Sequence, residues 1–286
     1  MSMVPDSLHP AFSDKSADVV LQSVEGTMYR VHAFTLRNTS GFFRTMLSLP
    51  QTSESKVHHE IPVGEKDAVL ERVLRMMCGL EIPRWTSFNE LESTLDLIEK
   101  WDAPGPLSIV RTAITSPLFA NEPLRVYVLA THFGWEEETK EVLVNTLKLE
   151  LLNGQHDATL CRLSSRSLLT LLAFHDRCKT RFKNALDGTD LFSAGNEEPR
   201  ECGCGKRMDN YSWRVLKAKV FQLILEFNRR PLGDHTLVDM SGWPESAACW
   251  RAKCQCGHLY YDQVSTVANI KESIQDASST AHLEPS

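Results

Sequence analysis

The most constraining feature of this sequence is a junction near its start, where a strand pattern changes into a helix pattern with no Gly or Pro between them. Residues 18–23 (DVVLQS) and 27–32 (TMYRVH) are short, rich in β-branched or aromatic residues, and separated by a turn that contains Gly26. This arrangement predicts a β-hairpin. From Leu36 onward, apolar residues recur at helical spacing. Because a lone hairpin is not stable in water, its apolar face is expected to pack on the helices that follow.

The segments after the hairpin predict a small mixed domain. Ser40 and Gly41 divide the first helical pattern into two short helices. Residues 59–63 (HEIPV) have the composition of a third strand. Residues 67–79 and 90–101 carry apolar side chains at helical spacing and predict amphipathic helices. The predicted order is strand, strand, helix pair, strand, helix, helix, which belongs to the α+β class.

These residues resemble the BTB/POZ domain over roughly residues 14–115. The resemblance rests on an aspartate–valine strand, a hairpin that ends in a valine–histidine pair, and spaced residues in the helices beyond it, namely Asp18-Val19-Val20-Leu21, Tyr29, Val31-His32, Leu36, Ser40, Phe43 and Met46. It implies the BTB/POZ fold, a small three-stranded sheet with helices, followed here by a mostly helical C-terminal region. The chain as a whole is similar to fungal, basidiomycete-type BTB proteins.

The resemblance also implies a function in protein–protein interaction, commonly as a homodimer and without catalytic residues. Many family members are adaptors for cullin-type ubiquitin ligases, and these usually carry an apolar residue and a glutamate after the second short helix. Here that segment is SLPQTSESK, in which Glu54 could supply the acid while the polar run lacks the apolar partner. His32 is expected to be a packed histidine rather than a ligand or base. Phe42 and Phe43 are expected to be surface and core neighbours.

The rest of the chain predicts two further regions and a tail. Residues 116–190 form a helical extension, in which Pro123 suits the first turn of a helix and Gly134 can end it. Residues 196–275 form a helical region that contains cysteines and a possible metal site. Residues 276–286 are small and polar, and are expected to be a disordered tail.

Two Cys-x-Cys pairs, each beside a glycine, lie about fifty residues apart in this last region. Tetrahedral zinc is bound by four thiolate or imidazole ligands, usually in pairs two to four residues apart. The best single set is Cys202, Cys204, Cys254 and Cys256. Gly203 is expected to let the backbone turn sharply enough to aim both sulfurs of its pair inward. With four protein ligands, such a zinc ion would be structural.

Other assignments of these cysteines stay open. Cys249 and His258 are spare ligands near the second pair, and His175 with Cys178 could complete a site, because a three-residue step on a helix directs both side chains to one side. Reduced, unliganded thiols are the plain alternative. Redox exchange ranks last, because the usual two-residue spacing is missing.

Charge and missing motifs exclude several function classes. The net charge is −6, so the chain as a whole does not attract nucleic acid or anionic membrane. No basic and apolar leader opens the sequence, and no window approaches the about 18 apolar residues of a membrane span. A soluble protein of the cytoplasm or nucleus, with no membrane partner, is expected. No phosphate-binding loop or nucleophile elbow occurs, and His58-His59-Glu60 precedes a strand, so an enzyme is not expected.

Two functional hypotheses remain. The first is a self-associating BTB-type interaction module that acts as an adaptor or scaffold for other proteins, which include a cullin in some family members. The second is a nucleic-acid-associated transcriptional regulator that uses a metal-stabilised C-terminal region. Its motivation is a cysteine region that could bind zinc, joined to a domain of a kind common in transcription regulators. The contact would use a basic cluster, which is more often a solvated face than a binding site: Arg177, Lys179, Arg181 and Lys183.

Overall fold

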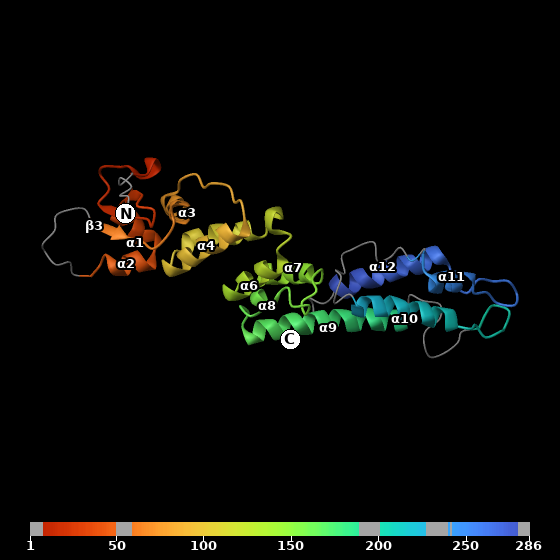
Figure 1. Ribbon diagram of the computed structural model, residues 1–286. Helices are drawn as coiled ribbons and strands as arrows, with labels where there is room; N and C mark the ends of the chain where they lie inside the picture. Colours follow the sequence, from red (N-terminus) through yellow and green to blue (C-terminus); the bar gives the residue numbers. More distant parts are fainter. Residues whose placement is uncertain (1–7, 50–58, 189–200, 227–239, 241, 280–286) are drawn as a thin grey trace. The chain divides into compact units, whose positions relative to one another are not determined.

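The computed structural model describes residues 8–49, 59–188, 201–226, 240 and 242–279 (Figure 1). The chain divides into two compact units, Met1–Glu122 and Pro123–Ser286. The first contains a small mixed sheet and helices, and the second is helical, so the α+β class expected from the sequence is confirmed. No helix within the described ranges is both long enough and apolar enough to cross a membrane.

The sheet of the first unit contains the three strands that the sequence predicts. They are β1 (Val19–Gln22), β2 (Met28–Val31) and β3 (His59–Pro62), in the order β2-β1-β3. Strand β1 pairs antiparallel with β2 and parallel with β3. Gly26, with φ of 87°, lies in the turn of the β1–β2 hairpin. More residues of β1 than of β2 are buried, because β1 is the central strand and has a neighbour on each side.

The junction between strand and helix is stabilised by a side chain rather than by a turn residue. Helix α1 (Ala33–Thr39) begins two residues after β2 ends, and the Asp18 carboxylate accepts a hydrogen bond of 2.7 Å from the backbone N–H of Ala33. The carboxylate therefore satisfies one of the free amides at the start of the helix. The packed position expected for His32 is wrong, because its side chain is 48% exposed and lies 3.2 Å from Asp14 Oδ2.

A second junction separates α1 from the next helix. The Ser40 hydroxyl accepts a hydrogen bond from the Phe43 N–H and donates one of 2.5 Å to the Trp101 carbonyl. A Cβ atom on Gly41 would lie 1.9 Å from Asp102 Oδ2, so any other residue here would displace the Asp102 side chain. Ser40 and Gly41 thus divide the helical segment in two, as predicted. Their contacts also hold the junction between the two helices against the backbone around Trp101. The other helices of the unit are α2 (Gly41–Met46), α3 (Asp67–Cys78), α4 (Phe88–Lys100), α5 (Pro104–Ile114) and the short 3-10 turns η1 (Pro10–Phe12) and η2 (Pro117–Phe119).

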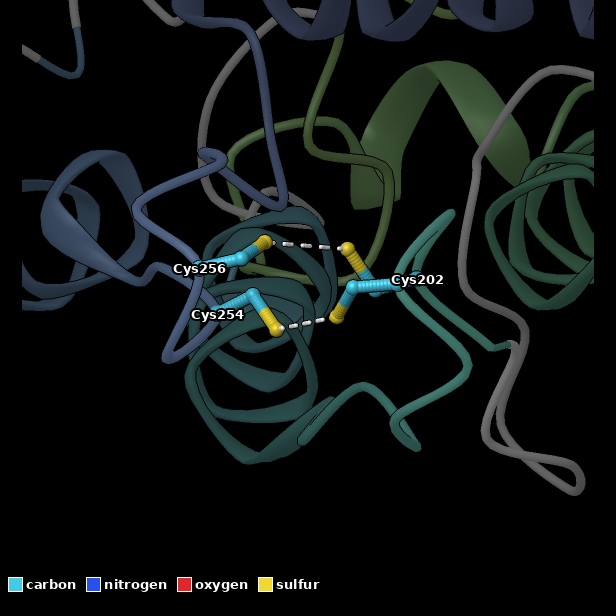
Figure 2. A group of neighbouring side chains, drawn as sticks. Cys202, Cys254 and Cys256 are labelled. Atoms are coloured by element: carbon cyan, nitrogen blue, oxygen red, sulfur yellow. Dashed lines mark hydrogen bonds between the residues drawn. The ribbon is translucent and has the colours of Figure 1, made fainter.

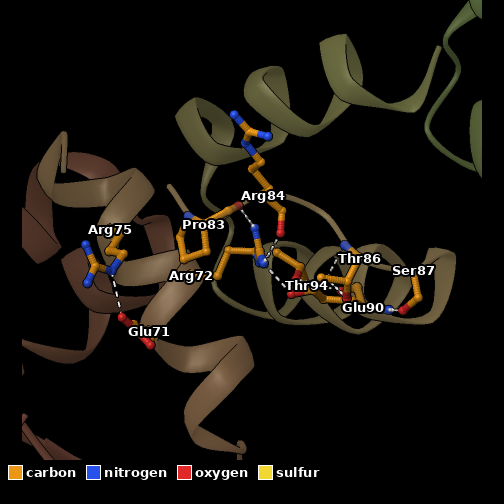
Figure 3. Close-up of polar contacts among 9 residues, drawn as sticks. All are labelled: Glu71, Arg72, Arg75, Pro83, Arg84, Thr86, Ser87, Glu90 and Thr94. Atoms are coloured by element: carbon orange, nitrogen blue, oxygen red, sulfur yellow. Dashed lines mark hydrogen bonds and ion pairs between the residues drawn. The ribbon is translucent and has the colours of Figure 1, made fainter. Parts of the chain in front are cut away.

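The core of the first unit lies between the sheet and helices α1 to α5, and a buried cation joins two of these helices. Arg72, on α3, is 3% exposed. It donates hydrogen bonds to the carbonyls of Pro83 and Arg84 and pairs with the Glu90 carboxylate on α4 (Figure 3). Its guanidinium lies 4.2 Å from the centre of the Trp85 ring. We call this set the Arg72 network.

The second unit consists of helices. They are α6 (Pro123–His132), α7 (Glu136–Thr146), α8 (Asp157–Leu160), α9 (Ser165–Asp187), α10 (Tyr211–Glu226), α11 (Pro244–Arg251) and α12 (Gln263–Ser279). Gly134, with φ of 68°, follows α6, as predicted. Helix α12 runs to Ser279, into the segment from residue 276 that was expected to be disordered, and residues 280–286 lie outside the described ranges.

An apolar cluster holds the last four helices together. Its buried members come from α9 to α12 and the segments between them, and they are Phe182, Leu186, Trp213, Leu216, Val220, Met240, Cys249, Tyr261, Ile270 and Ala277. A smaller cluster lies at the cysteine turns, where Met208 and Tyr260 pack with Cys202 and Cys254. The two cysteine turns are therefore packed against apolar side chains that form a cluster separate from the larger one.

Candidate metal centre

The first Cys-x-Cys pair lies in a closed turn that directly precedes α10. The Cys202 N–H donates to the Lys206 carbonyl at 2.7 Å, and the Gly205 N–H donates back to the Cys202 carbonyl at 2.7 Å. An antiparallel bridge between Glu201 and Arg207 flanks the turn. Gly205 has φ of 80°, a conformation that costs other residues free energy. The turn thus directs two cysteine side chains to the same place.

The second pair repeats this turn before α12, with every position 52 residues later in the chain. The Cys254 N–H donates to the His258 carbonyl at 2.8 Å, and the Gly257 N–H donates to the Cys254 carbonyl at 2.9 Å. Gly257 has φ of 88°, and Lys253 bridges to Leu259. The two turns therefore share both their hydrogen bonds and their sequence, Cys-x-Cys-Gly.

The repeat continues into the helices. Helix α10 begins after Asn210 and α12 after Asp262, which are also 52 residues apart. The carbonyls of these two residues accept equivalent bonds of 3.0 Å from Arg214 and Thr266. Each half of the site is therefore the same unit, a cysteine turn followed by a helix that starts after an Asn or Asp, the residue types preferred there.

The four sulfurs of the two turns converge, and among the described residues the group that could hold a metal ion consists of these four cysteines (Figure 2). Cys202 Sγ lies 3.6 Å from Cys256 Sγ, and Cys204 Sγ lies 3.4 Å from Cys254 Sγ. All four sulfurs lie within 4.8 Å of one another. A tetrahedral zinc ion with Zn–S bonds of about 2.3 Å requires sulfur separations of about 3.8 Å, whereas a disulfide requires about 2.05 Å. The spacing fits a shared cation and is too long for existing disulfides.

The thiols of the cluster compete for protons. The backbone amide of Cys256 and hydrogen bonding from Cys204 lower the pKa of the Cys254 thiol to about 6. The amide of Lys206 lowers the pKa of the Cys204 thiol, but the bond to Cys254 and burial raise it more, to about 11. The Cys254 sulfur therefore ionises more easily than the Cys204 sulfur. A soft divalent cation can replace the thiol protons, because thiolate is the form that binds metal.

The spare ligands named from the sequence lie elsewhere. His258 is exposed in the second turn and does not belong to the four-sulfur group. Cys249 is buried in the apolar cluster, where burial raises its pKa to about 12. His175 and Cys178 are buried in α9, and His175 Nε2 lies 3.0 Å from Thr146 Oγ1. Among the described residues, the converging set is the one predicted as best.

The glycine that shapes each turn was missed by the sequence analysis. Gly203 was expected to make the turn, but it has no positive φ. Gly205 and Gly257 hold the left-handed conformation instead. The signal that could have identified them is the shared Cys-x-Cys-Gly order, because the intervening residue is Gly203 in one turn and Gln255 in the other.

The basic cluster near Cys178 is partly used in packing. Arg177, Lys179 and Arg181 are partly buried, and desolvation lowers the pKa of Lys179. The ammonium group of Lys183 lies 5.6 Å from the centre of the Phe221 ring. Of the four side chains, Lys183 alone is exposed, so most of the charge of this cluster is partly shielded from solvent.

Together, fold and site define a class, an α+β protein whose helical unit contains a four-cysteine cluster. Comparison with protein-family models and with curated proteins gives no match. The function therefore has to be inferred from the geometry of the molecule itself.

Proposed function

We propose that this protein is an interaction protein of BTB/POZ type that self-associates through its first unit and acts as an adaptor for other proteins. The element order and the mixed sheet, with a strand pair that leads directly into α1 and α2, support this proposal. The segment that would decide between cullin and other partners, with Glu54, falls outside the described ranges. The adaptor role is therefore proposed for protein partners as a class.

The observation that carries the proposal is a set of exposed apolar side chains on and beside α1 and α2. Phe34 is 76% exposed, Phe42 is 44% exposed and Leu49 is 60% exposed. Phe42 contacts the fully buried Phe43 edge-on, so its ring is held in place by the core. The exposure of large apolar side chains on two consecutive helices, and just after them, supports a surface that binds other polypeptides.

Substitution of this surface tests self-association. Full-length protein carrying both Phe34→Asp and Phe42→Asp is compared with wild type by light scattering after gel filtration. The control is Leu152→Asp, at a side chain that is 72% exposed in the other unit. We expect a wild-type dimer, a monomeric double variant and a dimeric control. A monomeric wild type at tens of micromolar would overturn the proposal, as would a double variant that remains dimeric.

We also propose that the four cysteines hold a structural zinc ion. Soft thiolates favour zinc among the common divalent metals, and four protein ligands leave no position for a reactive water. The exposed cations Lys206 and Lys253, within or beside the two turns, would offset part of the negative charge of four thiolates. Lys206 also donates a hydrogen bond to Gln255 of the opposite turn, which helps to join the two halves.

Cobalt substitution tests this site directly. Co²⁺ in a tetrahedral thiolate site gives intense sulfur-to-metal charge-transfer absorption, which zinc then abolishes. The matched variants are Cys254→Ser, inside the cluster, and Cys161→Ser, at an exposed thiol outside it. We expect one metal per chain for wild type and Cys161→Ser, and a large loss of affinity for Cys254→Ser. Equal spectra for the two variants would show that the cluster is not the metal site.

A further inference from the structure

The four sulfurs are not equivalent, because they form two close pairs across the turns. One pair is Cys202 with Cys256, at 3.6 Å, and the other is Cys204 with Cys254, at 3.4 Å (Figure 2). Cys204 and Cys256 are exposed, whereas Cys202 and Cys254 are buried. Each pair therefore consists of one thiol that solvent can reach and one that is shielded, and the two thiols come from opposite turns.

We propose that the cluster is an oxidation site for peroxides, at which two cross-turn disulfides form, Cys202–Cys256 and Cys204–Cys254. The proposal rests on the placement of the sulfurs alone and holds whichever metal the site binds. In each pair, one sulfur reacts with the oxidant and the other resolves the product. Access and thiolate character together decide which cysteine of a pair is oxidised first.

The chemistry of one pair balances with one molecule of hydrogen peroxide. One thiolate of the pair attacks one peroxide oxygen, the O–O bond breaks, and a sulfenic acid and a hydroxide ion result. The other thiolate then attacks the sulfenic sulfur, the S–S bond forms, and the S–O bond breaks with loss of a second hydroxide. Two electrons pass from the two sulfurs to the peroxide. Two peroxide molecules oxidise the whole cluster, and any bound divalent cation leaves unchanged.

Cross-turn pairing has a structural consequence that pairing within a turn lacks. To reach a disulfide length of about 2.05 Å, the two close pairs need to approach by about 1.4 Å and about 1.6 Å. The products would connect the turn before α10 to the turn before α12, so the two halves would stay joined without metal. Pairing within each turn would release the halves from one another. The predicted oxidised form is therefore still closed.

Other thiols of the chain are unsuited to this reaction. Cys178 and Cys249 are buried and do not belong to the four-sulfur group. Cys161 is exposed but does not belong to the cluster. Full-length Cys161→Ser is therefore the best starting protein, because it removes the exposed thiol that could form links between chains.

Peptide mapping distinguishes pairing across the two turns from pairing within each turn. Full-length Cys161→Ser, with and without prior metal removal by a chelator, is treated with hydrogen peroxide, alkylated and digested with trypsin without reduction. Cleavage gives ECGCGK and CQCGHLYYDQVSTVANIK, each of which contains one cysteine pair. We expect the loss of both free peptides and the appearance of one linked species. Two separate peptides with internal disulfides, or peptides that remain fully alkylated, would overturn the proposal.

Two double variants in the same background assign the partners. Cys204→Ser with Cys254→Ser keeps the 3.6 Å pair, and Cys204→Ser with Cys256→Ser keeps the two buried sulfurs. We expect faster disulfide formation in the first. Equal rates in variants whose circular dichroism matches that of wild type would overturn the assigned pairing. If the linked species forms in a protein that binds no zinc, the metal proposal fails and this one stands.

Discussion

The two units of the protein each contain a polar group of contacts that holds loops against helices, and these differ in what they need to be complete. In the first unit, the Arg72 cation meets carbonyls and the Glu90 carboxylate, all from the same chain (Figure 3). In the second unit, four cysteine thiols lie next to one another, so the groups that meet are chemically identical and do not neutralise each other. The first arrangement is neutralised internally. The second requires protons, a metal ion or disulfide bonds.

The pKa shifts in the two regions reflect this difference. Burial would raise the pKa of Glu90, but hydrogen bonds from Thr86 and the Arg72 charge lower it below its usual value. Its carboxylate is therefore held ionised by the fold. Among the cysteines, the bond between Cys204 and Cys254 raises the pKa of the first thiol and lowers that of the second. The first unit should be insensitive to metal and redox conditions, and the second should respond to both.

Metal removal is expected to have the largest effect. Structural zinc sites bind with apparent free energies of about 10–16 kcal/mol, more than any single side chain contributes. Chelation under reducing conditions should therefore expose α10 and α12 to hydrogen exchange while the Arg72 network stays protected. Hydrogen-exchange mass spectrometry measures both in one sample. Equal exchange in the two units would mean that the distinction between them is wrong.

Loss of the Arg72 cation is expected to be the next largest effect. Arg72→Ala leaves the Glu90 carboxylate without its buried partner, and breaking such a pair costs about 3–5 kcal/mol. The control is Arg75→Ala on the same helix, whose pair with Glu71 is 22% and 26% exposed and should contribute about 1 kcal/mol or less. Denaturant unfolding with chelator present and absent gives both values. The cost of Arg72→Ala should not depend on the chelator.

Acid is expected to weaken the second unit through His175. Thr146 Oγ1 donates to the Leu143 carbonyl at 2.6 Å, so the His175 ring must donate its Nε2–H to Thr146. Burial, with help from Lys179, lowers the pKa of His175 to about 4. Because the folded pKa is below the unfolded value of about 6.5, the neutral ring stabilises the fold above that pH.

This stability is lost as pH falls from about 6.5 to about 4, by roughly 2–3 kcal/mol in total. His175→Gln keeps a donor for Thr146 but cannot titrate, so its stability should fall less over the same range. Calorimetry of the two proteins at matched pH isolates the histidine from the cysteines, which both proteins share. A His175 that titrates near its ordinary pKa by NMR would contradict this prediction.

The sequence was sufficient for the local elements and for the choice of cysteines, but not for contacts between distant residues. The hairpin and its helices could be predicted because β-branched runs, Gly26 and apolar spacing are local signals. The Arg72 network could not, because its partners lie 11 to 18 residues away and depend on how two helices pack. His32 was misplaced for the same reason, since its contact with Asp14 is a tertiary contact.

At the cysteine site, one feature was predicted correctly from the sequence and another was predicted wrongly. Cys-x-Cys spacing identified the four sulfurs that converge, because two thiols so close in sequence must share a turn. The backbone conformation that makes the turn was assigned to the wrong glycine, since Gly203 also lies between cysteines. Comparing Gly203 with Gln255, its equivalent in the second turn, shows that a side chain fits that position. Comparison of the two turns thus identifies which glycine position tolerates a side chain, and one turn alone does not.

The smallest expected effect separates these two glycines. Gly205 has φ of 80°, so Gly205→Ala should cost about 1–2 kcal/mol in backbone strain. That cost should weaken metal binding about tenfold, since each 1.4 kcal/mol is a factor of ten. Gly203 has no positive φ, and a Cβ there meets no atom within 4 Å, so Gly203→Ala should be neutral or slightly stabilising. Competition with a chromophoric chelator measures both affinities. If Gly203→Ala weakens binding as much as Gly205→Ala, the cysteine turn is not shaped by the left-handed residue, and the likeness between the two turns does not explain the site.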